Sequence, residues 1–142
     1  MSYDDASHAT QERNAREALL CARLNLRGAR RLLHKGAQRR GIAALYDSVL
    51  FGMQYYVTRH DDCADIDIAD ATGLFHLLTR LGIFEDPLAF NRLSLTVELA
   101  LWQEAVSLDT HAILEEVEEI LTRLGVMTFQ KSTLLKKSKI SH

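Results

Sequence analysis

The sequence contains a single proline, Pro87, and only seven glycines among its 142 residues. An all-β protein of this length needs many tight turns, and Gly and Pro are the residues that most often form them. The shortage therefore predicts an all-α fold of few, long helices joined by short connections. A chain of this length suits one domain and can bury a hydrophobic core without a metal or a disulfide.

Cysteines, long apolar runs and an excess of charge are also lacking. The two isolated cysteines, Cys21 and Cys63, indicate a reducing compartment and small packed side chains rather than a disulfide framework. The first residues are polar and acidic, unlike a secretion signal, and no run approaches the ~18 apolar residues of a membrane span. We therefore expect a cytoplasmic protein without a membrane segment. The formal net charge of −2 argues against a general nucleic-acid coat.

Apolar residues recur at helical spacing in five segments. The expected helices cover approximately residues 9–35, 41–59, 67–82, 88–106 and 110–124. In the first of them, Leu20, Leu24 and Leu32 widen the apolar stripe. Asp67 is expected to cap the third helix, with Asp70 in the capping-box position, and Asp109 or Thr110 to cap the fifth. The sequence thus predicts an antiparallel bundle of about five helices over residues 1–127 and a mobile tail over 128–142.

The fourth segment is ambiguous. Its alternating apolar residues fit a strand, and these are Leu93, Leu95, Val97, Leu99 and Leu101. A second apolar set fits a helix, and its members are Leu88, Leu95, Leu99, Trp102 and Val106. The stretch after Pro87 is long and contains no Gly or Pro, so its length favours the helix.

Two groups of side chains could bind a metal or act in catalysis, but structural roles explain them better. The acidic stretch from His60 to Asp67 has none of the spacings that hold zinc or calcium, which favours a solvated loop. Cys21 lies beside the apolar stripe of the first helix, which favours burial over nucleophilic catalysis. No glycine follows a strand as a nucleotide-binding loop requires. We therefore expect no metal and no cofactor.

Basic residues are dense towards the end of the first helix. Arg23, Arg27, Arg30 and His34 are spaced by four, three and four residues, so they share one helix face. Further basic residues follow, and these are Arg31, Lys35, Arg39 and Arg40. A solvated face is the ordinary interpretation of such a cluster. The alternative is a surface for RNA, a nucleotide or an acidic partner.

Two stretches resemble HEPN domains, particularly the small ones that pair with minimal nucleotidyltransferases. Residues 43–53, AALYDSVLFGM, are similar to that family's second helix, which is rich in small and aromatic residues. Residues 70–124 follow the order of its C-terminal half: a helix ending in LGIF, a short loop, a helix containing Asn91 and Arg92, and a capped last helix. The resemblance implies a homodimer and a nucleotidyltransferase-type partner.

The catalytic signature of HEPN ribonucleases is an arginine followed, after four to six residues, by a histidine. Here the matching arginine is Arg92, and Val97 stands five positions later. Valine cannot transfer a proton, so Arg92 is left to pair with an acid such as Glu98, or to hold a phosphate or a partner's carboxylate.

Two classes of function remain open. The first is a non-catalytic interaction module, which we expect to be a homodimer formed through the apolar faces of the second and fourth helices with Tyr56 and Trp102. Such a module would dock on a protein partner or bind RNA or nucleotide weakly. The alternative is a metal-independent ribonuclease of the HEPN type, in which Arg92 works with a histidine from elsewhere.

Overall fold

The computed structural model describes residues 3–60, 67–86, 88–102 and 108–127, with side chains from residue 9 onwards. These residues form five α-helices and no strand, which confirms the all-α prediction. The helices are α1 (Tyr3–His34), α2 (Gln38–Arg59), α3 (Ala71–Arg80), α4 (Ala89–Trp102) and α5 (Thr110–Arg123). The expected tail over 128–142 and most of the acidic loop lie outside the described residues.

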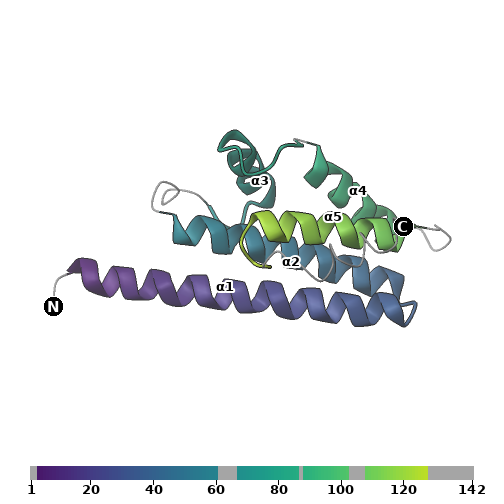
Figure 1. Ribbon diagram of the computed structural model, residues 1–142, viewed down its shortest axis with the longest axis horizontal. Coiled ribbons are helices and arrows are strands. Elements are labelled where there is room, and N and C mark those ends of the chain that lie inside the picture. Colours follow the sequence, from purple (N-terminus) through teal and green to yellow (C-terminus); the bar gives the residue numbers. More distant parts are fainter. Residues whose placement is uncertain (1–2, 61–66, 87, 103–107, 128–142) are drawn as a thin grey trace, which may run out of the picture.

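Helices α1 and α2 form an antiparallel hairpin closed by a short turn (Figure 1). α1 has 32 residues and is therefore about 48 Å long. Gly36 ends it with a positive φ of 82°, and the N–H of Ala37 donates to the carbonyl of Leu32 at 2.8 Å. α2 then begins at Gln38, earlier than the predicted start at Gly41. α1 likewise begins well before residue 9, so the polar leader is part of the helix.

Helix α2 is the centre of the bundle, with α1 on one side and α3, α4 and α5 on the other (Figure 1). α5 runs in the same direction as α2, whereas α4 runs against α5. Gly52 permits the close approach of α2 and α5, because a Cβ there would lie 3.0 Å from Leu121 Cδ2 and 3.1 Å from Leu124 Cδ1. Nine residues of α2 are buried, which leaves little of its apolar surface for a partner.

Four aromatic rings pack together where α2, α3, α4 and the α3–α4 loop meet. Phe75 of α3 stacks on Phe84 at 4.9 Å and on Phe90 of α4 at 5.2 Å, and Phe90 also meets Tyr46 of α2 at 5.6 Å. These separations are typical of favourable aromatic pairs. Burial within the cluster, followed by the charge of Asp47, raises the pKa of the Tyr46 hydroxyl.

The start of α3 differs from the prediction. Asp70 is the N-cap, and its Oδ1 accepts a hydrogen bond from the N–H of Gly73 at 3.0 Å. Asp67, the expected cap, instead accepts from the N–H of Ala69 in the turn before the helix. Ile68 consequently precedes the helix and is exposed. The predicted cap of α5 is confirmed, because Asp109 Oδ1 accepts from the N–H of Ala112 at 3.0 Å.

The ambiguous fourth segment is a helix, and its geometry explains the strand-like alternation. Ala89, Leu93 and Ala100 are buried against the bundle. Leu95 and Trp102, on the opposite side of the same helix, are exposed. Because apolar residues occupy both faces, they recur more often than one helical stripe requires, and an alternating pattern results.

Candidate functional site

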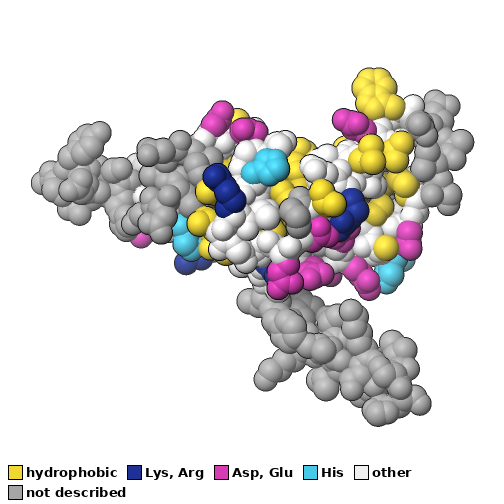
Figure 2. All heavy atoms as spheres, turned by 90° about the horizontal axis from the view of Figure 1, so that it is seen from above, with side chains coloured by type: hydrophobic (Ala, Val, Ile, Leu, Met, Phe, Trp, Pro, Cys, Tyr) yellow, Lys and Arg dark blue, Asp and Glu magenta, His cyan; other side chains and the backbone are white. Residues whose placement is uncertain are grey.

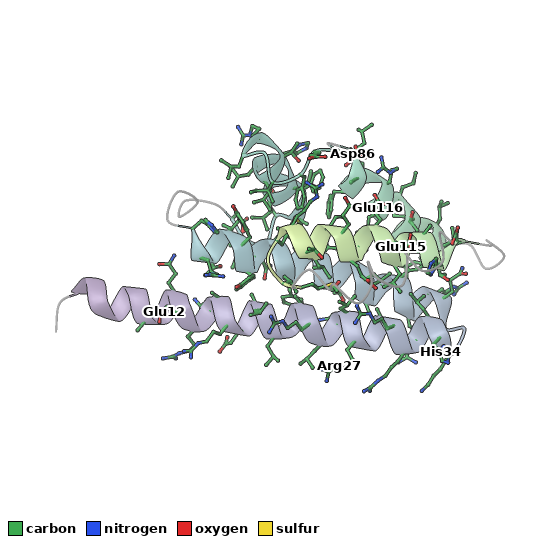
Figure 3. All side chains as sticks on the ribbon, in the orientation of Figure 1. Glu12, Arg27, His34, Asp86, Glu115 and Glu116 are labelled. Atoms are coloured by element: carbon green, nitrogen blue, oxygen red, sulfur yellow. The ribbon has the colours of Figure 1, made fainter. Side chains whose placement is uncertain are left out.

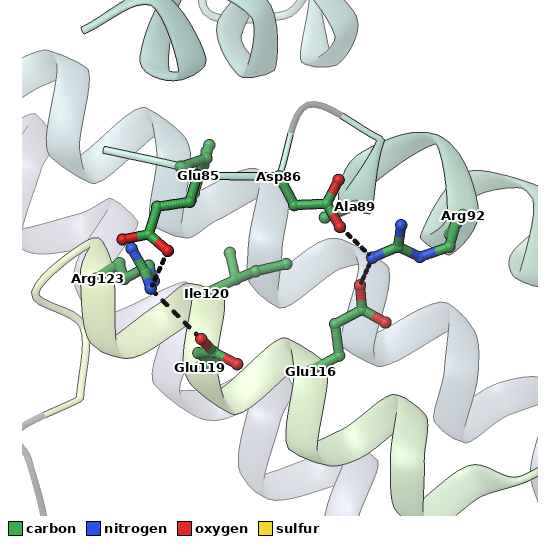
Figure 4. A pocket seen from close by; sticks show the side chains of 9 residues that line it. Glu85, Asp86, Ala89, Arg92, Glu116, Glu119, Ile120 and Arg123 are labelled. Atoms are coloured by element: carbon green, nitrogen blue, oxygen red, sulfur yellow. Dashed lines mark hydrogen bonds and ion pairs between the residues drawn. The ribbon is translucent and has the colours of Figure 1, made fainter. Parts of the chain in front are cut away.

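A charged pocket lies between α4, α5 and the loop that joins α3 to α4 (Figure 4). Its volume is about 290 Å³. Phe84, Ala89 and Ile120 supply its apolar wall. The remaining lining residues are all charged, and these are Glu85, Asp86, Arg92, Glu116, Glu119 and Arg123. Arg92, the arginine that matches the HEPN signature, is therefore one of the residues that line this charged pocket.

Arg92 is bound by two carboxylates within this pocket. Its Nη2 lies 2.6 Å from Asp86 Oδ2 and 3.0 Å from Glu116 Oε1. The hydrogen bond from Arg92, followed by one from the backbone N–H of Leu88, lowers the pKa of Asp86. The same two carboxylates raise the pKa of Arg92. Arg92 thus pairs with acidic residues, as one of its predicted roles required, but its partners are Asp86 and Glu116 rather than Glu98, the acid named as an example.

Arg123 of α5 repeats this arrangement at the other end of the pocket. Its Nη2 lies 3.5 Å from Glu85 Oε2 and 3.4 Å from Glu119 Oε1 (Figure 4). Each arginine thus joins one carboxylate of the α3–α4 loop to one carboxylate of α5. These ion pairs connect the loop and the start of α4 to α5. The guanidinium groups of Arg92 and Arg123 are both engaged in them.

The surroundings of Arg92 contain no proton-transfer histidine in the part of the chain described. The ring of His111 pairs with Glu115, at 3.2 Å, and does not contact Arg92. Five positions along a helix correspond to a rotation of about 140°. Val97, which is half-buried, therefore lies on a different side of α4 from Arg92. The pocket therefore contains ion-paired arginines and carboxylates without a proton-transfer partner. Among the described residues, no group of His, Cys, Asp or Glu is arranged to hold a metal.

The basic face predicted on α1 is divided by its contacts. Arg23 donates from Nε to the carbonyl of Val126 at 3.1 Å, and Arg30 pairs with Glu118 of α5 at 3.3 Å. These two arginines connect α1 to α5 and to the segment that follows it. Arg27 extends into solvent on the side away from α2, and His34 is exposed in the last turn (Figure 3). Arg31 lies in the same last turn, where the helix dipole favours a cation.

The outer face of α4 carries the most exposed large apolar side chain of the described residues, Trp102, at 83%. Leu88 and Leu95 are exposed beside it, and Leu99 is half-buried. These four positions are spaced by seven, four and three residues, so they form one stripe along the helix. Hydrophobic side chains gather at the end of the molecule that α4 forms (Figure 2). We call Leu88, Leu95, Leu99 and Trp102 the outer stripe of α4.

Other apolar surface is scattered or already covered. Leu20 and Leu24 of α1, which were expected to widen the buried stripe, are 57% and 53% exposed. Tyr56 of α2, the expected companion of Trp102, is half-buried and stacks on His60 with ring centroids 4.0 Å apart. No helix among the described residues is long and apolar enough to cross a membrane.

Most partners in the charged pocket were not identified from the sequence. These are Glu85, Asp86, Glu116, Glu119 and Arg123. Only Asp86 gives a local signal, because it immediately precedes Pro87 and the start of a helix. Its Oδ1 accepts from the N–H of Leu88 at 2.9 Å in the turn before α4. Comparisons of the chain with protein-family models, curated proteins and solved structures find no match.

Proposed function

We propose that this protein is a non-catalytic helical interaction module that associates through the outer stripe of α4. The observation that supports the proposal is the exposure of Trp102 beside Leu88 and Leu95 on one helix face. The opposite face of the same helix is fully used in the core. Scattered exposed leucines are common on soluble proteins, but a contiguous stripe that includes tryptophan is typical of binding surfaces.

The size of the stripe sets the expected strength of association. α4 has 14 residues and is about 21 Å long. A standard interface buries about 800 Å² on each partner, and one helix of this length offers less. We therefore propose a reversible homodimer with a dissociation constant of roughly tens of micromolar. The same surface suits a helical protein partner, and the HEPN resemblance adds a nucleotidyltransferase-type protein as a candidate.

Sedimentation equilibrium over a range of protein concentrations tests the proposal. The parent protein should shift from monomer to dimer, and Leu95→Glu and Trp102→Glu should each abolish the shift. Leu20→Glu is the matched control, because Leu20 is an equally exposed leucine on α1. Circular dichroism should show the same helix content for all four proteins. A parent that remains monomeric, or a Leu20→Glu variant that loses association while Leu95→Glu keeps it, would refute the proposal.

Weak binding of RNA or nucleotide is a second candidate function. Exposed arginines on α1 and at the start of α2 favour it. Arg27, Arg31, Arg39 and Arg40 are exposed there, and within the described residues none forms an ion pair. A group of unpaired arginines attracts phosphate without sequence preference. We propose that any such binding is electrostatic and involves Arg27 rather than Arg23, Arg30 or Arg92, whose guanidinium groups are engaged.

A further inference from the structure

A second cleft lies at the end of the α1–α2 hairpin opposite the Gly36 turn (Figure 1). Its volume is about 530 Å³, within the range of roughly 300–1,000 Å³ that small-molecule sites occupy. The described residues that line it all belong to α1 and α2, and these are Gln11, Glu12, Ala15, Arg16, Leu19, Tyr55, Thr58 and Arg59. We call it the hairpin cleft. It is separate from the outer stripe of α4.

The hairpin cleft has an apolar floor. Ala15 and Tyr55 are 5% and 7% exposed, and Leu19 is half-buried. Gln11 of α1 donates from Nε2 to the carbonyl of Thr58 of α2 at 2.6 Å and joins the two helices beside this floor. The lining residues of α1 extend over about 12 Å, which suits the apolar body of a small organic molecule.

Hydrogen-bond donors lie next to the apolar floor. Arg59 Nη1 donates to the hydroxyl oxygen of Tyr55, and the guanidinium carbon lies 5.3 Å from the centre of the Tyr55 ring. These two contacts hold the Arg59 side chain in place and leave its other N–H groups as donors. Within the described residues, the Tyr55 O–H donates to no acceptor of its own. The cleft therefore contains donors that are already positioned for a ligand.

The charges of the lining residues do not balance. Arg16 of α1 and Arg59 of α2 are both exposed, and neither forms an ion pair within the described residues. Glu12, labelled in Figure 3, is the one carboxylate among the lining residues. Two cations against one anion favour a negatively charged ligand. Hydrogen bonds from a guanidinium to a carboxylate are also stronger than those between neutral groups.

We propose that the hairpin cleft binds a small organic carboxylate with an apolar body, of the medium-chain acyl type. The carboxylate accepts hydrogen bonds from Arg16, Arg59 and the Tyr55 O–H, and the apolar body covers Ala15 and Leu19. A cationic ligand would meet two guanidinium groups, and a neutral ligand would offer them no charge to pair with. This inference goes beyond the proposed function, since the cleft requires neither a dimer nor a protein partner.

Titration of the full chain with sodium octanoate, followed by amide NMR, tests the proposal. Octanoate should cause saturable shifts of the signals of the lining residues on α1 and α2. Octanol has a similar apolar body without the charge, and it should bind at least about fivefold more weakly. Acetate has the charge without the apolar body, and it should cause no saturable shift at the same concentrations. Added salt should weaken the binding of octanoate but not that of octanol.

Substitutions in the hairpin cleft identify the groups that bind the carboxylate. Arg16→Gln and Arg59→Gln should each weaken octanoate binding about fivefold to tenfold, because each removes a charge-assisted hydrogen bond. Tyr55→Phe keeps the ring, removes only the hydroxyl and should have a smaller effect. Arg13→Gln is the matched control, because Arg13 is an exposed arginine of α1 that does not line the cleft. Circular dichroism should show the same helix content for all of these proteins.

The outcomes distinguish this inference from its alternatives. Shifts that centre on the hairpin cleft and weaken in Arg16→Gln and Arg59→Gln, but not in Arg13→Gln, support it. Equal affinities for octanoate and octanol would overturn it, because the carboxylate would then contribute nothing. Shifts centred elsewhere on the chain, or an absence of saturation, would overturn it too. The proposed association through α4 is tested by sedimentation alone, so either proposal can fail without the other.

Discussion

Asp86 binds Arg92 with one carboxylate oxygen, and with the other it accepts a hydrogen bond from the backbone N–H of Leu88, immediately before α4. Oδ2 lies 2.6 Å from Arg92 Nη2, and Oδ1 lies 2.9 Å from the backbone nitrogen of Leu88. Both bonds favour the ionised carboxylate and lower the pKa of Asp86. One side chain therefore fixes the position of the helix whose outer stripe is proposed to bind a partner.

The first prediction is that Asp86→Asn lowers the thermal stability at neutral pH but not in acid. Because the pKa of Asp86 is lower in the folded state, its ionised carboxylate contributes to folding stability at pH values above the unfolded pKa. That contribution is lost as the pH falls through the folded pKa. Thermal unfolding followed by circular dichroism should show a gap between parent and variant at neutral pH that closes in acid. A gap that is independent of pH would contradict the prediction.

Asp47→Asn is the control with the opposite sign. Burial raises the pKa of Asp47, so its charge opposes folding at pH values above the folded pKa. Removing the charge should leave the stability at neutral pH unchanged or slightly higher. The difference from the parent should again disappear in acid, where both carboxyl groups are protonated.

The second prediction concerns two helical glycines with opposite surroundings. Gly28 of α1 has no heavy atom within 4 Å of the place where a Cβ would lie. Gly28→Ala should therefore stabilise the fold by roughly 0.5–1 kcal/mol through helix propensity alone. Gly52→Ala places a Cβ 3.0 Å from Leu121 and should destabilise by about 1–2 kcal/mol. Denaturant unfolding of the pair measures both, and equal signs would contradict the prediction.

The helices were predictable because each carries a local signal in its own sequence. The buried stripe of α1 includes Ala15, Ala22 and Ala29, which recur every seven residues. Asp109 precedes the periodic residues of α5 and caps it as expected. The predicted cap of α3, Asp67, was wrong, because Asp67 and Asp70 are both of a residue type that caps helices and Asp70 is the N-cap. Only the packing of Leu74 and Phe75 against the bundle distinguishes them, and that packing is not a local property.

The candidate site was only partly predictable, because its partners come from distant parts of the chain. Arg23, Arg27 and Arg30 share a helix face by spacing alone. The position of α5 then engages Arg30 with Glu118, and the segment after α5 engages Arg23. Similarly, Arg92 meets Glu116 only because α4 and α5 run against each other. Helical periodicity gives the face of a side chain but not the element that covers it.

The third prediction separates the exposed arginine from the engaged ones. Arg27→Glu should weaken binding of a short single-stranded RNA several-fold at low salt, and this effect should vanish at high salt. Its thermal midpoint should equal that of the parent, because Arg27 makes no ion pair within the described residues. Fluorescence anisotropy and thermal unfolding measure the two properties.

Arg30→Ala is the comparison for Arg27→Glu. It removes the pair with Glu118 and should cost less than about 1 kcal/mol of stability, as surface ion pairs do. Its effect on RNA binding should be smaller than that of Arg27→Glu. The opposite order of the two variants in the anisotropy measurement would show that the basic face of α1 acts as one surface.

The last prediction is the absence of ribonuclease activity. Metal-independent RNA cleavage needs a group that takes a proton from the 2′-hydroxyl or gives one to the leaving oxygen, and histidine suits both tasks near neutral pH. Arg92 stays protonated, its raised pKa strengthens that state, and its Nη2 already holds Asp86 and Glu116. Purified protein incubated with structured and unstructured RNA should leave both intact, at concentrations up to those at which the proposed dimer is expected. Cleavage that is lost in Arg92→Ala, with helix content unchanged, would instead favour the ribonuclease alternative. In that case the proton-transfer group would have to come from outside the described surroundings of Arg92, and single His→Ala variants at each of the six histidines would identify it.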